Sequence, residues 1–431
     1  MVKKILITPF QKFIKIESAA GILLLVSTIV ALVWANSAFG NHYVAIWQYN
    51  IGIVTDDFEF KKPLILWIND GLMAIFFFLI GLEIKREVLI GELNSLKKMA
   101  FPLMGALGGM LLPVAVFFLL NQNPDTTRGW GIPMATDIAF SLAVLKTLGK
   151  RVPLSLIVFL TAFAIVDDIA AVLVIALFYS ETLNMSLLLI ALALLAILYL
   201  FSFRGFYSNY VFLFLGIVIW FLFLNSGIHP TVAGILMAFS VPVRKKTDVS
   251  TFLVQLEAVF QNIKKDGVSD KPTLSKKQIE NMDKLKDSSA KVQSPLQSLE
   301  HILNGWVAYL IIPLFALANA GVLIDSSAYL ETALVTNIVI CFVLGKGIGI
   351  SSIVMFAQRF KWIEIPGDIS FKQILGVSFL AGIGFTMAIF IAGLAFAETP
   401  QFIDSAKIGI LIGSFISAII GYLILRIGSK N

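Results

Sequence analysis

The chain has 431 residues, of which 58% are hydrophobic and only 14% are charged, and its mean hydropathy is +0.89. A soluble domain carries roughly 25% charged residues, so this chain is not expected to be soluble but to cross a bilayer as helices that satisfy their own backbone hydrogen bonds. The net charge of +6 does not indicate nucleic-acid binding, because the basic residues fall in alternate loops, and the single cysteine excludes an intramolecular disulfide framework.

Twelve apolar segments, bounded by charges and by Gly, Pro or Asn, predict an all-α polytopic membrane protein. They cover residues 18–36, 64–86, 99–121, 131–147, 154–179, 185–203, 209–224, 227–242, 302–322, 334–357, 371–395 and 403–426. The loops rich in Lys and Arg are expected in the cytoplasm, which places both termini there. The first segment resembles a secretory signal, but is interpreted as an uncleaved span because so many spans follow it.

Two segments of this single transmembrane domain (residues 1–431) lie outside the spans. Residues 42–62 predict an extended or hairpin-like segment on the outer side. Residues 244–298 predict a cytoplasmic insertion. Its first part has apolar residues at helical spacing and predicts an amphipathic helix, lying on the membrane surface or against the protein. Its remainder is rich in Lys, Asp and Ser and predicts a flexible linker.

Two adjacent aspartates, Asp167 and Asp168, lie in the middle of an otherwise apolar span. An aspartate at mid-bilayer costs about 2.5–3.5 kcal/mol, so an intramembrane carboxylate indicates a function. Adjacent side chains point about 100° apart on a helix, so one carboxylate can face an aqueous cavity while the other faces a neighbouring helix. Because hard oxygen ligands suit small cations, the pair predicts a site where a proton and a cation exclude each other. The alternative is a hydrogen-bonded pair that only joins helices.

Two further ionisable residues lie within predicted spans. Asp137 follows Pro133 and Thr136, so residues 133–137 predict an unwound stretch, which is tolerated only where it is buried or lines a cavity. Alternatively, Thr136 or Asp137 caps a helix that starts late. Lys346 is central in its span and is expected to pair with one of the aspartates, unless its long side chain reaches the membrane interface.

Gly382 and Gly384 interrupt the span at 371–395. Glycines alone favour close packing as much as a break. However, residues 99–179 and 334–426 are two three-helix units, each with an interrupted middle member, and the number of spans between them makes their orientations opposite. The sequence therefore predicts inverted repeats with two discontinuous helices that cross at an ion site, as in secondary transporters.

Eight groups of residues, in order along the chain, carry a family resemblance. They are 67–74 with 81–87 (WINDGLMA, GLEIKRE), 135–140 (ATDIAF), 166–170 (VDDIA), 226–229 (SGIH), 299–301 (LEH), 306–309 with 318–321 (WVAY, ANAG), 344–346 (LGK) and 382–387 (GIGFTM). Together they resemble the NhaA family of bacterial Na⁺/H⁺ antiporters, in which paired broken helices are known. The resemblance covers everything except the cytoplasmic insertion.

The resemblance implies a secondary transporter of the bacterial inner membrane, not an enzyme, that needs no cofactor. It would expel Na⁺ or Li⁺ while admitting more protons, driven by the membrane potential, and so serve pH and sodium homeostasis. The outer segment would be the contact of a homodimer. The implied site comprises Asp167 and Asp168 as ion ligands, Lys346 as the partner of Asp167, and Thr136, Asp137, Gly382 and Gly384 at the helix crossing.

The resemblance also covers positions that the family uses in its pH response. The matching positions are Glu83, Arg86, Glu87, His229, Glu300 and His301, and the alternative for them is a solvated helix end with local salt bridges. This chain has Asn304 where the family has a histidine, lacks basic residues at Gln297 and Ser298, and carries its insertion just before them. The family's pH profile is therefore not transferred. Asp70 is either a helix cap or part of the ion route.

Two other functional classes fit the sequence less well. An intramembrane aspartyl protease needs aspartates that meet from different helices, which adjacent residues do not provide. A sodium-coupled symporter of an organic anion on a related fold is closer, but it needs additional cationic or polar groups for its substrate. Lys346 is the strong candidate for such a group within the spans.

Overall fold

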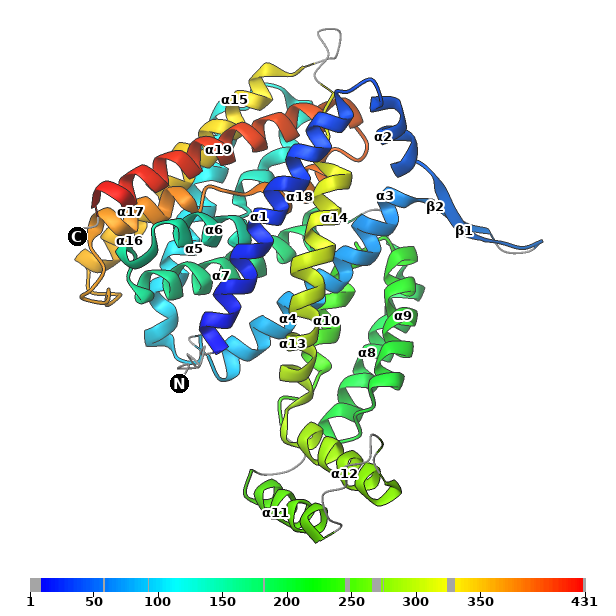
Figure 1. Ribbon diagram of the computed structural model, residues 1–431. Helices are drawn as coiled ribbons and strands as arrows, with labels where there is room; N and C mark the ends of the chain where they lie inside the picture. The colour runs from blue at the N-terminus through cyan, green and yellow to red at the C-terminus, as the bar shows by residue number, and fades with distance from the viewer. Residues whose placement is uncertain are drawn as a thin grey trace.

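The computed structural model describes residues 9–428 apart from residues 57–58, 92, 181–182, 245–248, 266–272, 274 and 324–329. These residues form helices and one two-stranded sheet (Figure 1). Among them, eight helices are long and apolar enough to cross a membrane. They are Leu64–Leu89 (α3, η1, α4), Leu96–Leu120 (α5), Leu154–Phe178 (α7), Met185–Phe203 (α8), Asn209–Ser226 (α9), Pro295–Asn319 (α13, η4, α14), Thr332–Arg359 (α15, η5, α16) and Pro400–Gly428 (η6, α19).

Two bent helix pairs and two shorter apolar helices complete the apolar part of the described chain. The pairs are α1 (Pro9–Ala35) with α2 (Gly40–Trp47), bent by 115°, and α17 (Phe371–Leu380) with α18 (Phe385–Ala395), bent by 45°. The shorter helices are α6 (Ile138–Thr147) and α10 (Thr231–Ser240). Each of the predicted segments coincides with one of these elements, so the prediction of a polytopic helical membrane protein is confirmed.

The segment predicted to lie on the outer side (residues 42–62) differs in part from its prediction. Its first residues form the helix α2 rather than an extended chain. The hairpin follows, with β1 (Asn50–Val54) antiparallel to β2 (Glu59–Pro63), and it projects away from the helices (Figure 1). All five residues of β1 are exposed.

The segment predicted as a cytoplasmic insertion (residues 244–298) contains more helix than the sequence predicted. The expected amphipathic helix is α11 (Val249–Lys265). The prediction of a flexible linker is wrong for α12 (Lys276–Val292), which begins with a capping box made by Ser275 and Gln278; such a box supplies partners for two unpaired N–H groups at the helix start. The next helix begins at Pro295, inside the predicted insertion and seven residues before the predicted span.

The predicted interruptions have local causes. Gly227 ends α9 with a φ of 87°, a left-handed conformation that glycine adopts without steric cost, and α10 starts a few residues later. The fourth predicted span starts as a 3₁₀ helix, η2 (Pro124–Met134), and becomes extended at Ala135 before α6 begins. The Ala381–Gly384 segment separates α17 from α18.

The two predicted repeats pack against each other. In Figure 1, α5, α6 and α7 lie among α15 to α19. The helices α5 and α16 approach so closely that a Cβ on Gly108 would collide with the carbonyl of Gly349, as is usual for small residues at membrane helix contacts. This packing holds the broken middle members of the two repeats side by side.

Three spans contain a π-helical turn among the described residues: η1 (Trp67–Leu72), η4 (Val307–Ile311) and η5 (Cys341–Lys346). Such turns are rare and occur often at functional sites. Here η1 contains Asp70 and η5 ends at Lys346, two residues that the sequence singled out.

Candidate functional site

The two broken helices meet where their backbones leave the helical hydrogen-bond pattern. The N–H of Asp137 donates to the carbonyl of Ile383 over 2.6 Å. The Thr136 hydroxyl donates to the carbonyl of Ala381 over 3.0 Å, and the Ser141 hydroxyl to that of Leu380 over 2.9 Å. Carbonyls freed by one break are thus satisfied by donors from the other, as burial in a membrane requires.

Asp137 caps two half-helices at once. Its Oδ1 accepts from the N–H of Phe140 in α6 (3.0 Å). Its Oδ2 accepts from the N–H (3.1 Å) and the hydroxyl (2.7 Å) of Thr386 in α18. The capping alternative is therefore true for α6 but incomplete, because the same carboxylate also lies at the positive N-terminus of α18.

Lys346 is fully buried, and its ammonium contacts three acceptors. It donates to the carbonyl of Met134 (2.6 Å), to the Thr136 hydroxyl and to Asp167 Oδ2 (3.1 Å). The predicted pairing of Lys346 with an aspartate is therefore present. The alternative, in which the lysine side chain extends to the membrane interface, is wrong. Because Met134 ends η2, the ammonium also lies at the negative end of that half-helix.

The two aspartates have different surroundings, as their adjacent positions predict. Asp167 is buried beside Lys346, yet its Oδ1 has no hydrogen-bond partner among the described residues. Asp168 is only half-buried and lies within electrostatic reach of Asp167, Asp137 and Lys346. One carboxylate is thus held by a neighbouring helix, while the other is partly exposed.

Sequence reasoning missed three hydroxyl residues at the crossing. Thr386 and Ser141 bond across it as described, and Ser414 in α19 accepts from the N–H of Gly384 over 3.3 Å. The available signals were weak: Thr386 follows the two glycines directly, and Ser141 lies four residues after Asp137. Ser414 had no local signal, because its partner is 30 positions away.

A second cluster of ionisable side chains surrounds Asp70, away from the crossing. Asp70 Oδ2 is 3.7 Å from Lys62 Nζ in β2, and its Oδ1 is 3.4 Å from His229 Nε2 at the α9–α10 break. The His229 ring packs edge-on against Phe390. Asp70 is therefore no helix cap, since its carboxylate joins three elements.

The candidate pH-response residues are only partly brought together. Arg86 contacts Glu87 Oε1 and Glu300 Oε1, each over 3.1 Å. Glu83 is half-buried, and the residue after Glu300, His301, is exposed. His229 lies apart from them with Asp70, which precedes Arg86 by 16 residues in one helical span, or about 24 Å.

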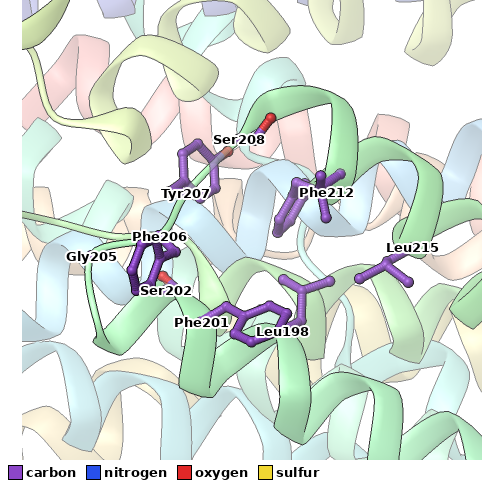
Figure 2. A pocket seen from close by; sticks show the side chains of 10 residues that line it. Leu198, Phe201, Ser202, Gly205, Phe206, Tyr207, Ser208, Phe212 and Leu215 are labelled. Carbon is purple, nitrogen blue, oxygen red and sulfur yellow. The ribbon is translucent and has the colours of Figure 1, made fainter.

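A cavity of about 400 Å³ lies elsewhere, at the turn between α8 and α9. Its wall is mainly aromatic and aliphatic, with Phe201, Phe206, Tyr207 and Phe212 around it (Figure 2). Burial raises the pKa of the Tyr207 phenol to about 12, so it stays protonated at physiological pH. None of the residues of the crossing lines this cavity, and its described lining contains no charged side chain.

Buried charges and crossed half-helices inside a multi-span bundle define a secondary ion transporter. The family described as "Na+/H+ antiporter 1" matches residues 11–425. The protein of Oleidesulfovibrio alaskensis named "Na(+)/H(+) antiporter NhaA" is 44% identical, with 98% of this chain and 94% of that protein covered. The protein of the same name from Helicobacter pylori strain 26695 is also 44% identical (96% and 94% covered). "Na(+)/H(+) antiporter NhaA 1" of Aliarcobacter butzleri is 40% identical (100% and 99%). The chain belongs to this Na⁺/H⁺ antiporter family.

Proposed function

We propose that the chain is an electrogenic antiporter that extrudes Na⁺ or Li⁺ in exchange for protons, with Asp167 and Asp168 as its ion-binding pair. Na⁺/H⁺ exchange is the activity that the names of its relatives state. The observation that carries the site assignment is the carboxylate pair beside Lys346 at the helix crossing. Its role in the cell is pH and sodium homeostasis.

Exchange follows from competition for one carboxylate pair. In the proton-loaded form, Asp168 holds a proton and Lys346 holds Asp167 Oδ2. An arriving Na⁺ takes Asp168 and the free Oδ1 of Asp167, which weakens the attraction between Asp167 and the ammonium. Asp168 gives up its proton to make room for Na⁺, and the Lys346 ammonium, less strongly attracted by Asp167, gives up a second one. Two protons thus leave for one cation, so net charge moves and the membrane potential drives the cycle.

The second candidate, a sodium-coupled symporter, needs a cation that can bind an organic anion. Lys346 is the cation at this site, and its three N–H groups are occupied by Met134, Thr136 and Asp167. The contacts of Lys346 therefore favour antiport.

The function is tested in everted membrane vesicles from a host that lacks its own sodium/proton antiporters. A ΔpH is imposed, and Na⁺, Li⁺ or K⁺ is added at pH values from acidic to alkaline. We expect Na⁺ and Li⁺ to collapse ΔpH. If neither does so at any pH, the proposal is wrong.

The contact of Arg86 with Glu300 is proposed to take part in a pH response. It joins α4 to α13 (Pro295–Trp306) with both side chains partly covered, at 34% and 13% exposure. An ion pair of this kind is worth up to about 1 kcal/mol, which corresponds to roughly 0.7 pH units.

Glu300→Gln is therefore expected to displace the pH profile of transport in vesicles by up to roughly 0.7 units, with the maximal rate retained. Gln mimics the protonated carboxyl, so activation should move to higher pH. Glu364→Gln is the control, because its pair with Lys97 is exposed on both sides (78% and 77%). An unchanged profile for Glu300→Gln would show that this contact is only structural.

The hairpin is proposed to be the contact of a homodimer. Ile51, Ile53 and Val54 are 45%, 66% and 61% exposed on β1, and a two-stranded sheet leaves both of its edges unpaired. Replacing residues 50–63 by a short Gly-Ser linker is expected to convert dimer to monomer in light scattering, while Na⁺-dependent transport persists. A linker variant that stays dimeric would refute this contact.

Both termini are proposed to lie in the cytoplasm of a bacterium, with the protein in the inner membrane. The support is the alternation of basic and base-poor loops. A fluorescent protein that folds only in the cytoplasm, fused to the C-terminus, is expected to be bright. A dark fusion at normal expression would reverse this orientation.

A further inference from the structure

Ser417 is a buried hydroxyl that the exchange mechanism leaves without a role. Ser417 is fully buried in α19 (Ile403–Gly428), and its Oγ has no hydrogen-bond partner among the residues that the structure describes. Other buried serines differ: Ser351 and Ser378 donate to the carbonyl four residues earlier in their own helices, over 2.6 Å and 2.8 Å. Ser417 makes no such bond and instead faces the α17–α18 break.

The surroundings of Gly382 define what Ser417 faces. A Cβ on Gly382 would lie 2.7 Å from Ser417 Oγ and 3.0 Å from the carbonyl oxygen of Phe379, and would collide with the carbonyl oxygen of Phe342. Three oxygens therefore converge beside this glycine, one of them a hydroxyl and two of them backbone acceptors. A carbonyl oxygen can accept two hydrogen bonds, so each is a potential acceptor for the hydroxyl after a small displacement.

A neighbouring serine shows how α19 engages the break. Ser414 precedes Ser417 by three residues, which places both on one face of the helix. In this arrangement Ser414 accepts from Gly384 N–H over 3.3 Å. The helix thus offers two hydroxyls to the break: that of Ser414 is hydrogen-bonded, and that of Ser417 has no partner within the described part of the chain.

We propose that Ser417 is a positioning residue for transport, whose hydroxyl donates to a backbone carbonyl beside Gly382 when the crossed half-helices shift between the two sides of the membrane. The inference rests on the proposed function, because it assigns Ser417 a part in the transport cycle. An unpaired buried hydroxyl disfavours the present arrangement, whereas its bond favours the alternative one. The hydroxyl therefore shifts the equilibrium between the two arrangements by roughly 5- to 150-fold.

The test compares Ser417→Ala with Ser378→Ala, two equally buried serines in the helices that pack around the break. The rate and the KM for Na⁺-dependent collapse of ΔpH are measured in vesicles, and the melting temperature is measured on purified protein in detergent. We expect Ser417→Ala to melt at or above the wild-type temperature while its maximal rate falls at least roughly fivefold. Ser378→Ala should melt lower and transport at the wild-type rate, and Ser417→Cys, a weak donor, should have an intermediate rate.

Two results would overturn the proposal. One is a wild-type rate for Ser417→Ala. The other is a slower rate together with a lower melting temperature, which would mean that the hydroxyl already stabilises the present arrangement. If wild-type vesicles show no collapse with Na⁺ or Li⁺, the proposed function fails and this inference fails with it.

Discussion

Asp168→Asn is expected to abolish the collapse of ΔpH by Na⁺ and Li⁺ in everted vesicles. Asparagine keeps the size of the side chain but has no negative charge and cannot bind and release a proton. Losing one charged ligand costs about 2–3 kcal/mol, or roughly 30- to 150-fold in cation affinity, and proton exchange at this position ends altogether. The variant should fold normally, because the half-buried Asp168 side chain has no partner that holds the helices together among the described contacts.

Two matched variants isolate the chemistry of this position. Asp168→Glu keeps the carboxylate and should retain partial transport with an altered KM for Na⁺. Asp368→Asn removes a carboxylate of the same kind from a surface loop, where it accepts from the Ser155 hydroxyl over 2.5 Å, and should leave transport unchanged. Wild-type transport by Asp168→Asn would mean that the ion binds elsewhere.

Lys346→Met is expected to have the largest effect on stability. It leaves the fully buried Asp167 carboxylate without its cation. It also removes the ammonium that donates hydrogen bonds to the Met134 carbonyl and the Thr136 hydroxyl. Breaking a buried ion pair from one side costs about 3–5 kcal/mol. The free energy of unfolding, measured by titration with a denaturing detergent from mild micelles, should fall by this amount.

The charge explanation is tested by a double variant. Lys346→Met with Asp167→Asn removes both charges and should recover most of the lost stability, because the effects of two contacting residues on stability are not additive. Transport should not recover. Lys407→Met is the control, since its partner Asp404 is 3.9 Å away and 51% exposed, so that carboxylate remains hydrated. If the double variant is as unstable as Lys346→Met, then packing around the lysine, and not the charge, explains the loss.

The spans could be predicted because hydrocarbon imposes one rule on each segment separately. A segment without charges that satisfies its own backbone becomes a helix, whatever its neighbours are. The same rule made Asp167, Asp168 and Lys346 visible as exceptions. It is silent outside the membrane, where α12 and α2 were predicted as linker and extended chain. The polar helix α12 begins with the capping box of Ser275 and Gln278, whereas α2 has no side-chain cap and buries Tyr43 and Trp47.

The sequence by itself determined that this protein spans a membrane and that its helices break near Asp137 and Gly382, and it singled out Asp167 and Asp168 as the proposed ion ligands. Each of these depends on the cost of local polar or flexible residues in lipid. Only the tertiary structure decided which groups meet. Asp137 finds Thr386 at a separation of 249 positions, and Lys346 finds Asp167 at a separation of 179. Partners so distant are fixed by helix packing, which brings two breaks of opposite repeats to one point, and no local pattern encodes that choice.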